Sequence, residues 1–324
     1  MPPSAPAVLA PRPSPFAGFT PFQGLIPGHL WANWLGVLTA HRFAAKPSPH
    51  NPDEPAWASP PLPRIEDGES FFEWLNVLNA VADAESMLTV VSLGAHYGRF
   101  LVNAAALAAE LNPLPFRLVA VEADPTQAAY IRQHFRNNGI DPEQHAVLNA
   151  AVGADSRPVL FPTGAGTGAN TALTRTTDRE GLAEQIVARE LAPHVVRRLF
   201  ADGRTGLDVP LYPGGPPGEL VFVSCLTVAD VVAPYDRIDY LEADIQGAEA
   251  VAFPPALASL KRKVRRLHIG THGAEVHAAL LGLFVAQGWR VEANYGPTAE
   301  HRSPYGAFRT NDGILTLRNP DLVA

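Results

Sequence analysis

Polar and glycine residues follow five short apolar runs of the sequence, at Gly94–Gly98, Glu122, Asn149–Ala151, Asp244 and His272. Apolar runs of this kind are typical of strands that are buried on both faces of a parallel sheet. In such a sheet, ligands bind outside the carboxyl ends of the strands, near the point where the strand order reverses. We therefore expect these five groups to meet at one ligand site.

The glycine turn and Glu122 indicate the class of ligand. Gly94 and Gly98 separate the run Leu88–Leu93 from a helix, and Glu122 ends the next apolar run. A carboxylate there can accept hydrogen bonds from both hydroxyls of an adenosine ribose, although a surface glutamate that caps the following helix is the alternative. A nicotinamide cofactor needs a G-x-G-x-x-G turn for its pyrophosphate, whereas His96 replaces the middle glycine. The turn thus favours S-adenosylmethionine, which has no phosphate, over the dinucleotide of a nicotinamide-dependent oxidoreductase.

Strands that alternate with helices must position these groups. The sequence predicts strands over 88–93, 117–121, 146–152, 238–243, 266–269, 290–293 and 313–317, with 159–161 as a short extension and 226–232 as a further apolar segment. Helices are expected over 69–84, 100–111, 126–138 and 276–287. This pattern predicts an α/β fold in which a mostly parallel sheet has helices on both faces.

Two segments stand outside this alternation. Residues 1–66 hold fifteen of the thirty-two prolines but also several large aromatic residues, so we expect an arm that wraps the domain or a neighbouring subunit, with a short helix over Pro27–Phe43. The domain itself is expected over 67–324. An insertion at about 163–222, with a helical segment near 180–200, is typical of a lid or substrate-facing element, and a subunit contact is the alternative. If the arm wraps a neighbouring subunit, the protein forms a homo-oligomer through it.

Composition and charge exclude several classes of partner. The net charge of −7 gives no reason to expect nucleic acid or an anionic membrane as a partner, and the basic cluster Lys261–Arg266 is expected to be a solvated connection. Cys225 is the only cysteine, so no disulfide forms within the chain. The sequence starts without the pattern of a signal peptide and holds no apolar stretch long enough to span a bilayer. We expect a cytoplasmic protein.

Four motifs in the same order resemble the FkbM family of S-adenosylmethionine-dependent methyltransferases. They are Val91–Gly98, Val121–Pro125, Ala150–Gly153 and Ile238–Glu249, and they are followed by Leu267–His272 where the family has a strand ending in Glu-x-His. The resemblance covers about residues 85–318. It implies a Rossmann-like class I methyltransferase fold with a seven-stranded sheet and a reversed last hairpin. It also implies O-methylation of a hydroxyl on a sugar, polyketide or similar metabolite, so that the partner is a small-molecule or saccharide acceptor.

The motifs and the strand ends together predict the residues that hold S-adenosylmethionine. These are Ser92, Gly94, Ala95, His96, Gly98, Glu122, Ala123, Asn149, Ala151 and Asp244. Three positions depart from the family pattern, which usually has Asp at Ser92, Asn at His96 and Glu at Gln246. The loss of two acids indicates either a different substrate, with a neighbouring group replacing the carboxylate at Ser92, or a weak enzyme. A degenerate domain that acts as a binding or assembly partner is the alternative function.

Asp244 and His272 are the candidate catalytic residues. Methyl transfer is an in-line displacement in which the protein mainly aligns the reacting atoms, and an aliphatic hydroxyl benefits from a positioned base. The ordinary pKa of histidine, about 6.5, suits this role. Glu249 is expected to cap or pair on the helix that it opens. We expect no metal ion, although Asp244, Glu249 and His272 together would offer mixed oxygen and nitrogen ligands.

Overall fold

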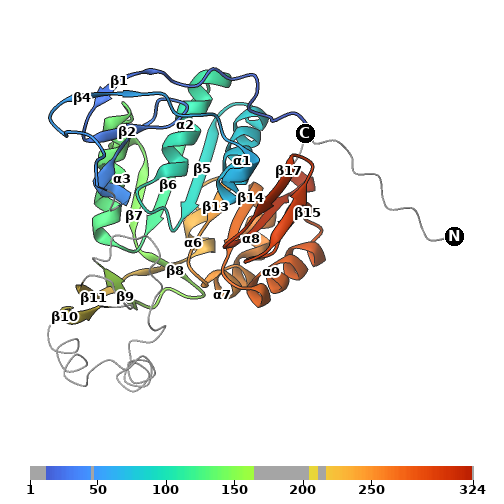
Figure 1. The fold of residues 1–324 in the computed structure, drawn as a ribbon. Helices are drawn as coiled ribbons and strands as arrows, with labels where there is room; N and C mark the ends of the chain where they lie inside the picture. Colours follow the sequence, from blue (N-terminus) through green and yellow to red (C-terminus); the bar gives the residue numbers. More distant parts are fainter. Residues whose placement is uncertain (1–11, 45–46, 164–203, 211–216, 323–324) are drawn as a thin grey trace.

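The computed structural model describes residues 12–44, 47–163, 204–210 and 217–322, and its centre is a seven-stranded sheet (Figure 1). Its strands are β5 (Leu88–Leu93), β6 (Phe116–Glu122), β7 (Ala146–Asn149), β13 (Ile238–Ala243), β14 (Val264–Thr271), β15 (Arg290–Tyr295) and β18 (Gly313–Arg318). They lie in the order β15-β18-β14-β13-β5-β6-β7. β18 runs antiparallel to both of its neighbours, and the other pairs are parallel. The predicted sheet with a reversed last hairpin is confirmed.

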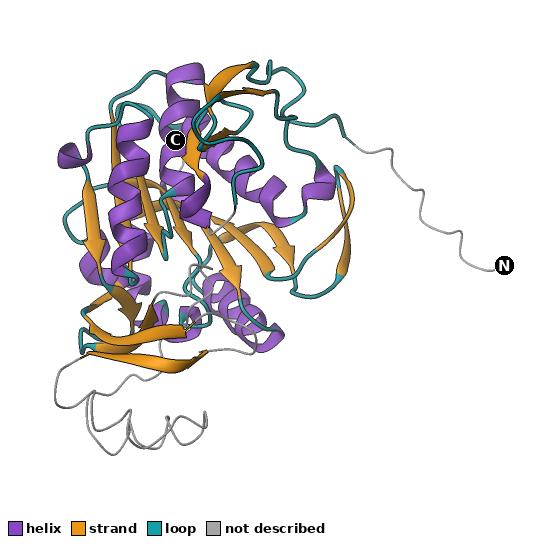
Figure 2. Cartoon of the chain, turned by 60° about the vertical axis from the view of Figure 1, so that its left-hand side comes forward, coloured by secondary structure: helices purple, strands orange, loops and turns teal. Residues whose placement is uncertain are grey.

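Helices cover both faces of this sheet (Figure 2). One layer consists of α1 (Glu69–Asp83), α2 (Arg99–Leu111) and α3 (Pro125–Asn137), and the other of α6 (Val228–Val232), α7 (Glu249–Ala252), α8 (Leu257–Lys263) and α9 (Ala274–Ala286). Side chains alternate along each strand, so Val90 packs in the first layer's core and Val91 in the second. Both faces are buried, which explains why the strands read as unbroken apolar runs.

The predicted strand 146–152 is wrong as a single strand. The chain leaves the main sheet at Ala150, whose N–H donates to the Glu122 carbonyl (3.0 Å). It continues as β8 (Ala151–Gly153), which pairs in parallel with β12 (Cys225–Thr227). The apolar segment 226–232 is correspondingly divided between β12 and α6. Because the apolar residues run on across Ala150, hydrophobicity alone does not mark the break.

The helix predicted over Pro27–Phe43 is also wrong. The segment forms the hairpin of β2 (Leu30–Ala32) and β3 (Leu38–Ala40), followed by a short 3-10 turn. The Asn33 side chain closes the hairpin by accepting hydrogen bonds from the N–H groups of Leu35 and Val37 (2.9 and 3.2 Å). Gly36 adopts a φ of +80°, which disfavours residues with a Cβ. A second antiparallel pair, β1 (Gly24–Pro27) and β4 (Pro55–Ala58), flanks the hairpin.

The described part of the arm packs on helices of its own chain. The Phe16 ring is fully buried and lies edge-on to Trp34 and Phe71, at 5.7 and 5.5 Å between ring centroids. The Leu38 N–H donates to Asn138 Oδ1 (2.8 Å), and Asn138 Nδ2 donates to the Leu38 carbonyl (2.9 Å). These two hydrogen bonds tie β3 to the end of α3. The arm is therefore part of the folded unit. Whether it also joins two subunits stays a prediction.

The insertion contributes a small antiparallel sheet, which lies apart from the main sheet in Figure 1. It consists of β9 (Val159–Thr163), β11 (Pro217–Val223) and β10 (Arg204–Pro210), so the predicted extension 159–161 belongs to it. The helical segment predicted near 180–200 lies outside the described residues. A further hairpin of β16 (Glu300–Ser303) and β17 (Gly306–Arg309), which the sequence analysis does not predict, precedes β18.

The basic cluster Lys261–Arg266 is only partly a solvated connection. Arg265 and Arg266 lie at the start of β14 and are buried, at 5% and 4% exposure. Arg266 pairs with Glu292 and Asp83, and Arg265 with Glu85. The prediction of a solvated connection is wrong for these two arginines. Their acidic partners lie on α1, on the segment after it and on β15, which are distant in the sequence and pack around the start of β14. Among the described residues, no helix is both long and apolar enough to cross a bilayer.

Candidate active site

The glycine turn joins three strand ends. The N–H groups of Gly94 and Ala95 donate to the Val121 carbonyl at the end of β6 (2.9 and 3.0 Å), and the Asp244 N–H donates to the Leu93 carbonyl of β5 (2.9 Å). Gly94 has a φ of +77°, and a Cβ there would lie 1.9 Å from the Asp244 carbonyl oxygen. The turn can therefore approach β13 this closely only with glycine. The structure thus brings the predicted residues 94–98, 122 and 244 together.

Glu122 faces the turn and not the following helix. Its carboxylate accepts hydrogen bonds from the N–H groups of His96 (2.7 Å) and Asp124 (2.8 Å). Asp124 is the residue that caps α3, since it accepts from the N–H groups of Thr126 and Gln127. The alternative of Glu122 as a helix cap is therefore wrong. Burial raises the pKa of Glu122 to about 7, against which its backbone hydrogen bonds act.

His96 is held in an unusual backbone conformation inside the turn. Its φ is +50°, and its Nε2 is buried with no hydrogen-bond partner among the described residues. Burial lowers the pKa of His96 to about 4, although the charge of Asp124 raises it. His96 is therefore neutral at physiological pH and offers a buried imidazole edge beside Glu122.

Asn149 supports the end of β6 through its side chain. Its Nδ2 donates to the carbonyls of Glu122 and Ala123 (2.9 and 3.0 Å). The Ala151 N–H donates to the Ser224 carbonyl (2.8 Å), so Ala151 belongs to the small β8–β12 pair. Asn149 and Ala151 therefore shape the edge of the site by holding its backbone.

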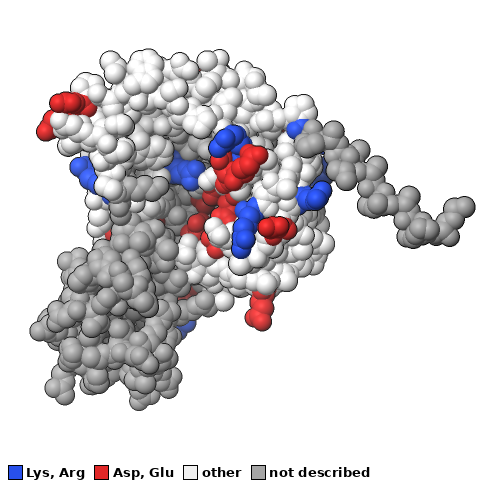
Figure 3. All heavy atoms as spheres, viewed as in Figure 1, with Lys and Arg blue, Asp and Glu red and all other residues white. Residues whose placement is uncertain are grey.

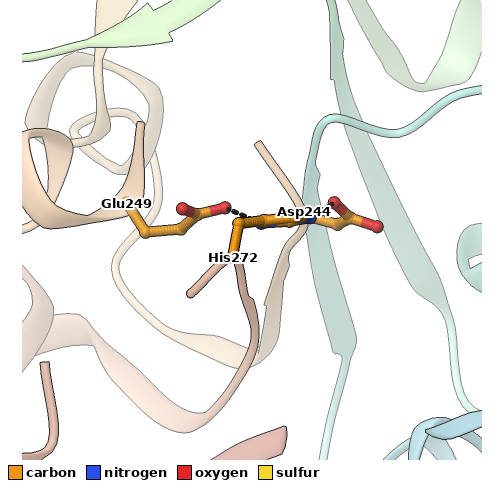
Figure 4. A group of neighbouring side chains, drawn as sticks. All are labelled: Asp244, Glu249 and His272. Atoms are coloured by element: carbon orange, nitrogen blue, oxygen red, sulfur yellow. Dashed lines mark hydrogen bonds and ion pairs between the residues drawn. The ribbon is translucent and has the colours of Figure 1, made fainter. Parts of the chain in front are cut away.

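Asp244, His272 and Glu249 form a row, in which the imidazole stands between two carboxylates (Figure 4). His272 Nδ1 lies 3.0 Å from Glu249 Oε1, and His272 Nε2 lies 3.3 Å from Asp244 Oδ1. Glu249 is fully buried, whereas the Asp244 side chain is 47% exposed. The prediction that Glu249 caps or pairs on the helix that it opens is wrong, because its carboxylate turns away from α7 to the Ile245 N–H and to His272, which directly follows β14.

Burial of the His272 ring lowers its pKa, but its acidic neighbours outweigh this effect. The hydrogen bond and charge of Glu249, with the charges of Asp244 and Asp312, raise the pKa of His272 above its ordinary value. Asp312 Oδ1 lies 3.9 Å from His272 Nε2. Glu69, at the start of α1, holds the Asp312 loop by accepting from its N–H (2.8 Å). Neither Asp312 nor Glu69 was predicted, because no motif surrounds them.

The same three residues have the composition of a cation site. Their ligand atoms all lie within 4.8 Å of one another. Yet each nitrogen of His272 faces a different carboxylate, so the ring lies between the two acids. This arrangement suits the transfer of a proton to the ring more directly than shared coordination of one ion.

Gln246 explains one departure from the family pattern. Its Nε2 donates to Asp244 Oδ1 (2.6 Å), and its backbone has a φ of +53°. A glutamate with the same side-chain position would set two carboxylates against each other. The amide therefore fixes Asp244 without adding charge.

Ser92 has a carboxylate neighbour that the sequence analysis missed. Ser92 Oγ donates to Glu242 Oε2 (2.5 Å), and the two residues are paired directly across β5 and β13. Burial raises the pKa of Glu242 well above its ordinary range. The alternation of β13 places Glu242 on the same face as Tyr240, so strand periodicity could have identified it. Glu242 is the neighbouring group beside the position where the family has Asp.

The residues at this edge fit S-adenosylmethionine better than a dinucleotide. Glu122 offers carboxylate oxygens for ribose hydroxyls, and the turn has His96 where a pyrophosphate needs glycine. The carboxylates around His272 make the site acidic, and Figure 3 shows acidic side chains gathered in a hollow near the centre of one face. An acidic site favours the positively charged sulfonium over an anionic ligand.

Comparisons with known proteins identify one curated relative and several solved structures that are similar to this chain. The chain is 23% identical over 250 residues to a protein of Jannaschia sp. (strain CCS1) named "Putative methyltransferase", which covers 77% of this chain and 79% of the relative. Methyltransferase FkbM of Methylobacillus flagellatus KT has a similar structure at 14% identity with a TM-score of 0.39, over 72% of this chain and 44% of that one. Precorrin-6y C5,15-methyltransferase of Geobacter metallireducens GS-15 has a TM-score of 0.36 at 10% identity, over 75% and 86%.

The family model described as the Methyltransferase FkbM domain matches residues 92–288, which is more than half of the chain. The match begins at Ser92 in β5 and ends at Gly288 after α9, and it includes Glu122, Asp244 and His272. The cofactor of this family is S-adenosylmethionine. The chain therefore belongs to the FkbM family of S-adenosylmethionine-dependent methyltransferases.

Proposed function

We propose that this methyltransferase acts on a hydroxyl oxygen of a sugar or other small metabolite, with His272 as the general base. The observation that carries the proposal is the contact of Glu249 Oε1 with His272 Nδ1 at 3.0 Å. A carboxylate that accepts from one ring nitrogen leaves the other nitrogen able to take a proton. A nitrogen atom with a free lone pair can accept the methyl group without such a base. The pairing of Glu249 with His272 therefore favours an alcohol as the methyl acceptor.

Bound S-adenosylmethionine supplies an electrophilic methyl group on a sulfonium. Glu122 would hold the ribose hydroxyls through its carboxylate, and the Gly94–Gly98 turn and Ala123 would hold the rest of the cofactor. Asp244 lies between this turn and His272, since its N–H donates to the Leu93 carbonyl (2.9 Å) and its Oδ1 lies 3.3 Å from His272 Nε2. Asp244 can therefore contact the amino group of the cofactor or orient the acceptor.

His272 removes the proton of the acceptor hydroxyl as the oxygen attacks. The proton passes to Nε2, while Nδ1–H remains bonded to Glu249, and the resulting imidazolium lies between Glu249 and Asp244. Both carboxylates stabilise that charge. Glu249 acts through His272 and is thus a positioning residue.

A transfer assay with deuterated S-adenosylmethionine tests this proposal. We expect the label on a hydroxyl oxygen of an accepted glycoside or polyol, as shown by mass and by NMR linkage analysis. The His272→Gln variant should lose about 10²- to 10⁴-fold in kcat, whereas His50→Gln, at an exposed histidine of the arm, should not change. Label on nitrogen or carbon, or full activity in His272→Gln, would contradict the proposal.

A further inference from the structure

We propose that the N-terminal arm, α1 and α2 form a binding pocket for a ring-shaped, polyhydroxylated ligand such as a glycoside. That this ligand is the methyl acceptor rests on the proposed function. The pocket has a volume of about 500 Å³, within the usual size of small-molecule sites. Its lining includes Trp31, Asn33 and Trp34 from the arm and Trp74, Arg99 and Asn103 from α1 and α2.

Three indoles supply the apolar surface of the pocket. Trp34 and Trp74 meet edge to face at 5.1 Å between ring centroids, and both are nearly buried. Trp31 stands on β2 and remains half-buried, so part of its ring is accessible. Flat aromatic faces with negative π surfaces attract the slightly positive C–H groups of a sugar ring. Trp31 is therefore the indole that can offer a face to a ligand, whereas Trp34 and Trp74 form the inner wall of the pocket.

Two lining residues carry buried donors that have no acceptor among the described residues. Asn33 Nδ2 donates to Asn103 Oδ1 (2.8 Å), and this bond leaves Asn103 Nδ2 without a partner. Trp34 Nε1 is also buried and unpartnered. Buried donors are normally paired, so each of these two N–H groups indicates an oxygen acceptor from outside the chain. Hydroxyl oxygens on a ring supply acceptors at several positions, whereas a purely apolar ligand supplies none.

The pocket adjoins the candidate active site through Arg99. Arg99 directly follows Gly98 of the glycine turn, donates to Ser70 Oγ (3.3 Å) and lies 3.6 Å from Glu73 Oε2. Burial raises the pKa of Glu73, Arg99 lowers it, and the charge of Asp244 raises it further. Glu73 thus lies within electrostatic reach of both the pocket and Asp244.

The direction of the helices supports this placement. α2 starts after the carboxyl end of β5. α1 ends five residues before β5 begins, so its last residues lie at the edge where the strand starts and its first residues lie at the opposite edge. Both helices therefore start at the edge of the sheet where the strands end. Glu69 of α1 confirms the position by binding the loop of Asp312, which is 3.9 Å from His272. An acceptor held between arm and helices would therefore lie at the same edge as the candidate base.

Saturation-transfer NMR and tryptophan fluorescence with four probes test the pocket. The probes are methyl β-D-glucopyranoside, methyl α-D-mannopyranoside and methyl β-D-galactopyranoside, with cyclohexanol as the probe that lacks the extra hydroxyls. We expect saturable binding of at least one glycoside, at least tenfold weaker in Trp31→Ala and in Asn103→Leu. Trp57→Ala, at the 64% exposed tryptophan of β4, is the matched control and should bind like the wild type.

Titration with S-adenosylhomocysteine separates this proposal from the proposed function and checks that each variant is folded. Glycoside binding without S-adenosylhomocysteine binding would contradict the methyl transfer and leave the pocket established. S-adenosylhomocysteine binding with no glycoside bound would overturn the pocket alone. Equal glycoside affinity in wild type and Trp31→Ala, or tighter binding of cyclohexanol than of every glycoside, would also overturn it.

Discussion

Glu249 Oε1 receives two hydrogen bonds at 3.0 Å, one from the backbone of Ile245 and one from His272 Nδ1. The first fixes the carboxylate relative to the segment that carries Asp244, and the second fixes the ring of the candidate base. One fully buried oxygen thus sets the relative position of β13's end and β14's end. Removal of the Glu249 carboxylate should therefore disturb the alignment of His272 without removing a group that binds cofactor or acceptor.

Glu249→Gln should lower kcat by about 10- to 100-fold with little change in KM, because the amide keeps the size of the side chain but loses its charge. The raised pKa of His272 depends on that charge. Wild-type kcat should rise with pH as the imidazolium loses its proton, and the midpoint should move to lower pH in the variant. A pH–rate profile measures this shift. Glu275→Gln, at an exposed acid of α9, is the control, and an unshifted midpoint would contradict the assignment.

Glu122 should make cofactor affinity depend on pH. Its pKa is about 7 in the free protein, and the ionised form is the better acceptor for two ribose hydroxyls. Affinity for S-adenosylhomocysteine should therefore increase between about pH 6 and pH 8, with the carboxyl releasing a proton on binding.

Glu122→Ala should weaken binding of S-adenosylhomocysteine by about 1–3 kcal/mol and abolish this pH dependence. Calorimetric titration in buffers of different ionisation enthalpy measures both the affinity and the proton release. The exposed Glu143→Ala is the control. Affinity that stays constant across this range in the wild type would argue against ribose binding by Glu122.

Acid should destabilise the contact between the arm and α3. Burial lowers the pKa of His134 to about 4, and this ring joins Thr39 Oγ1 and the Tyr97 carbonyl at 3.0 Å each. The unfolded chain binds a proton at this residue near pH 6.5 and the folded chain does not, so stability falls as the pH drops from about 6.5 to 4.

The loss from His134 alone can reach about 3 kcal/mol. Urea unfolding at pH 7 and pH 5 should show a smaller difference for His134→Gln than for the wild type or His50→Gln. An unchanged difference would mean that His134 is already protonated in the folded protein.

Ser92→Asp should destabilise the protein at pH 7 by about 3 kcal/mol, although the family usually has Asp here. The new carboxylate would be buried against Glu242, which Ser92 contacts at 2.5 Å. Stability should recover as the pH falls, because a protonated pair can share a hydrogen bond. Urea unfolding measures the effect, Glu242→Gln should rescue it, and Ser86→Asp on the surface is the control. Full stability of Ser92→Asp would show that water reaches this pair.

The sequence predicts those parts of the fold whose signal is local. The apolar run at 88–93 is the strand β5 with the same bounds, and Asp124-Pro125 starts α3 as predicted. Both features depend on residues that are neighbours in the sequence. The hairpin of β2 and β3 is different. Asn33 and Gly36 give its turn a local signal, but its attachment to α3 depends on the contact of Leu38 with Asn138, a hundred residues away.

The candidate site shows the same division. Glu122, Asp244 and His272 follow apolar runs, so their meeting at one edge follows from parallel strands alone. The pairing of Glu249 with His272 joins residues 23 positions apart on different elements, and its geometry needs the three-dimensional structure. Arg99 and Asp312 carry no motif and become candidates only through their distances to Glu73 and His272.

The bonds that hold the arm also set an order of assembly. Asn33 bonds to Asn103 across 70 positions, Thr39 to His134 across 95 and Leu38 to Asn138 across 100. During synthesis the arm leaves the ribosome before its partners on α2 and α3, which follow 70 to 100 residues later. Contacts of such long sequence separation form late, because loop closure must precede them. The contacts of Asn33, Leu38 and Thr39 with α2 and α3 are therefore expected to form late, and the pocket between the arm, α1 and α2 is completed with them.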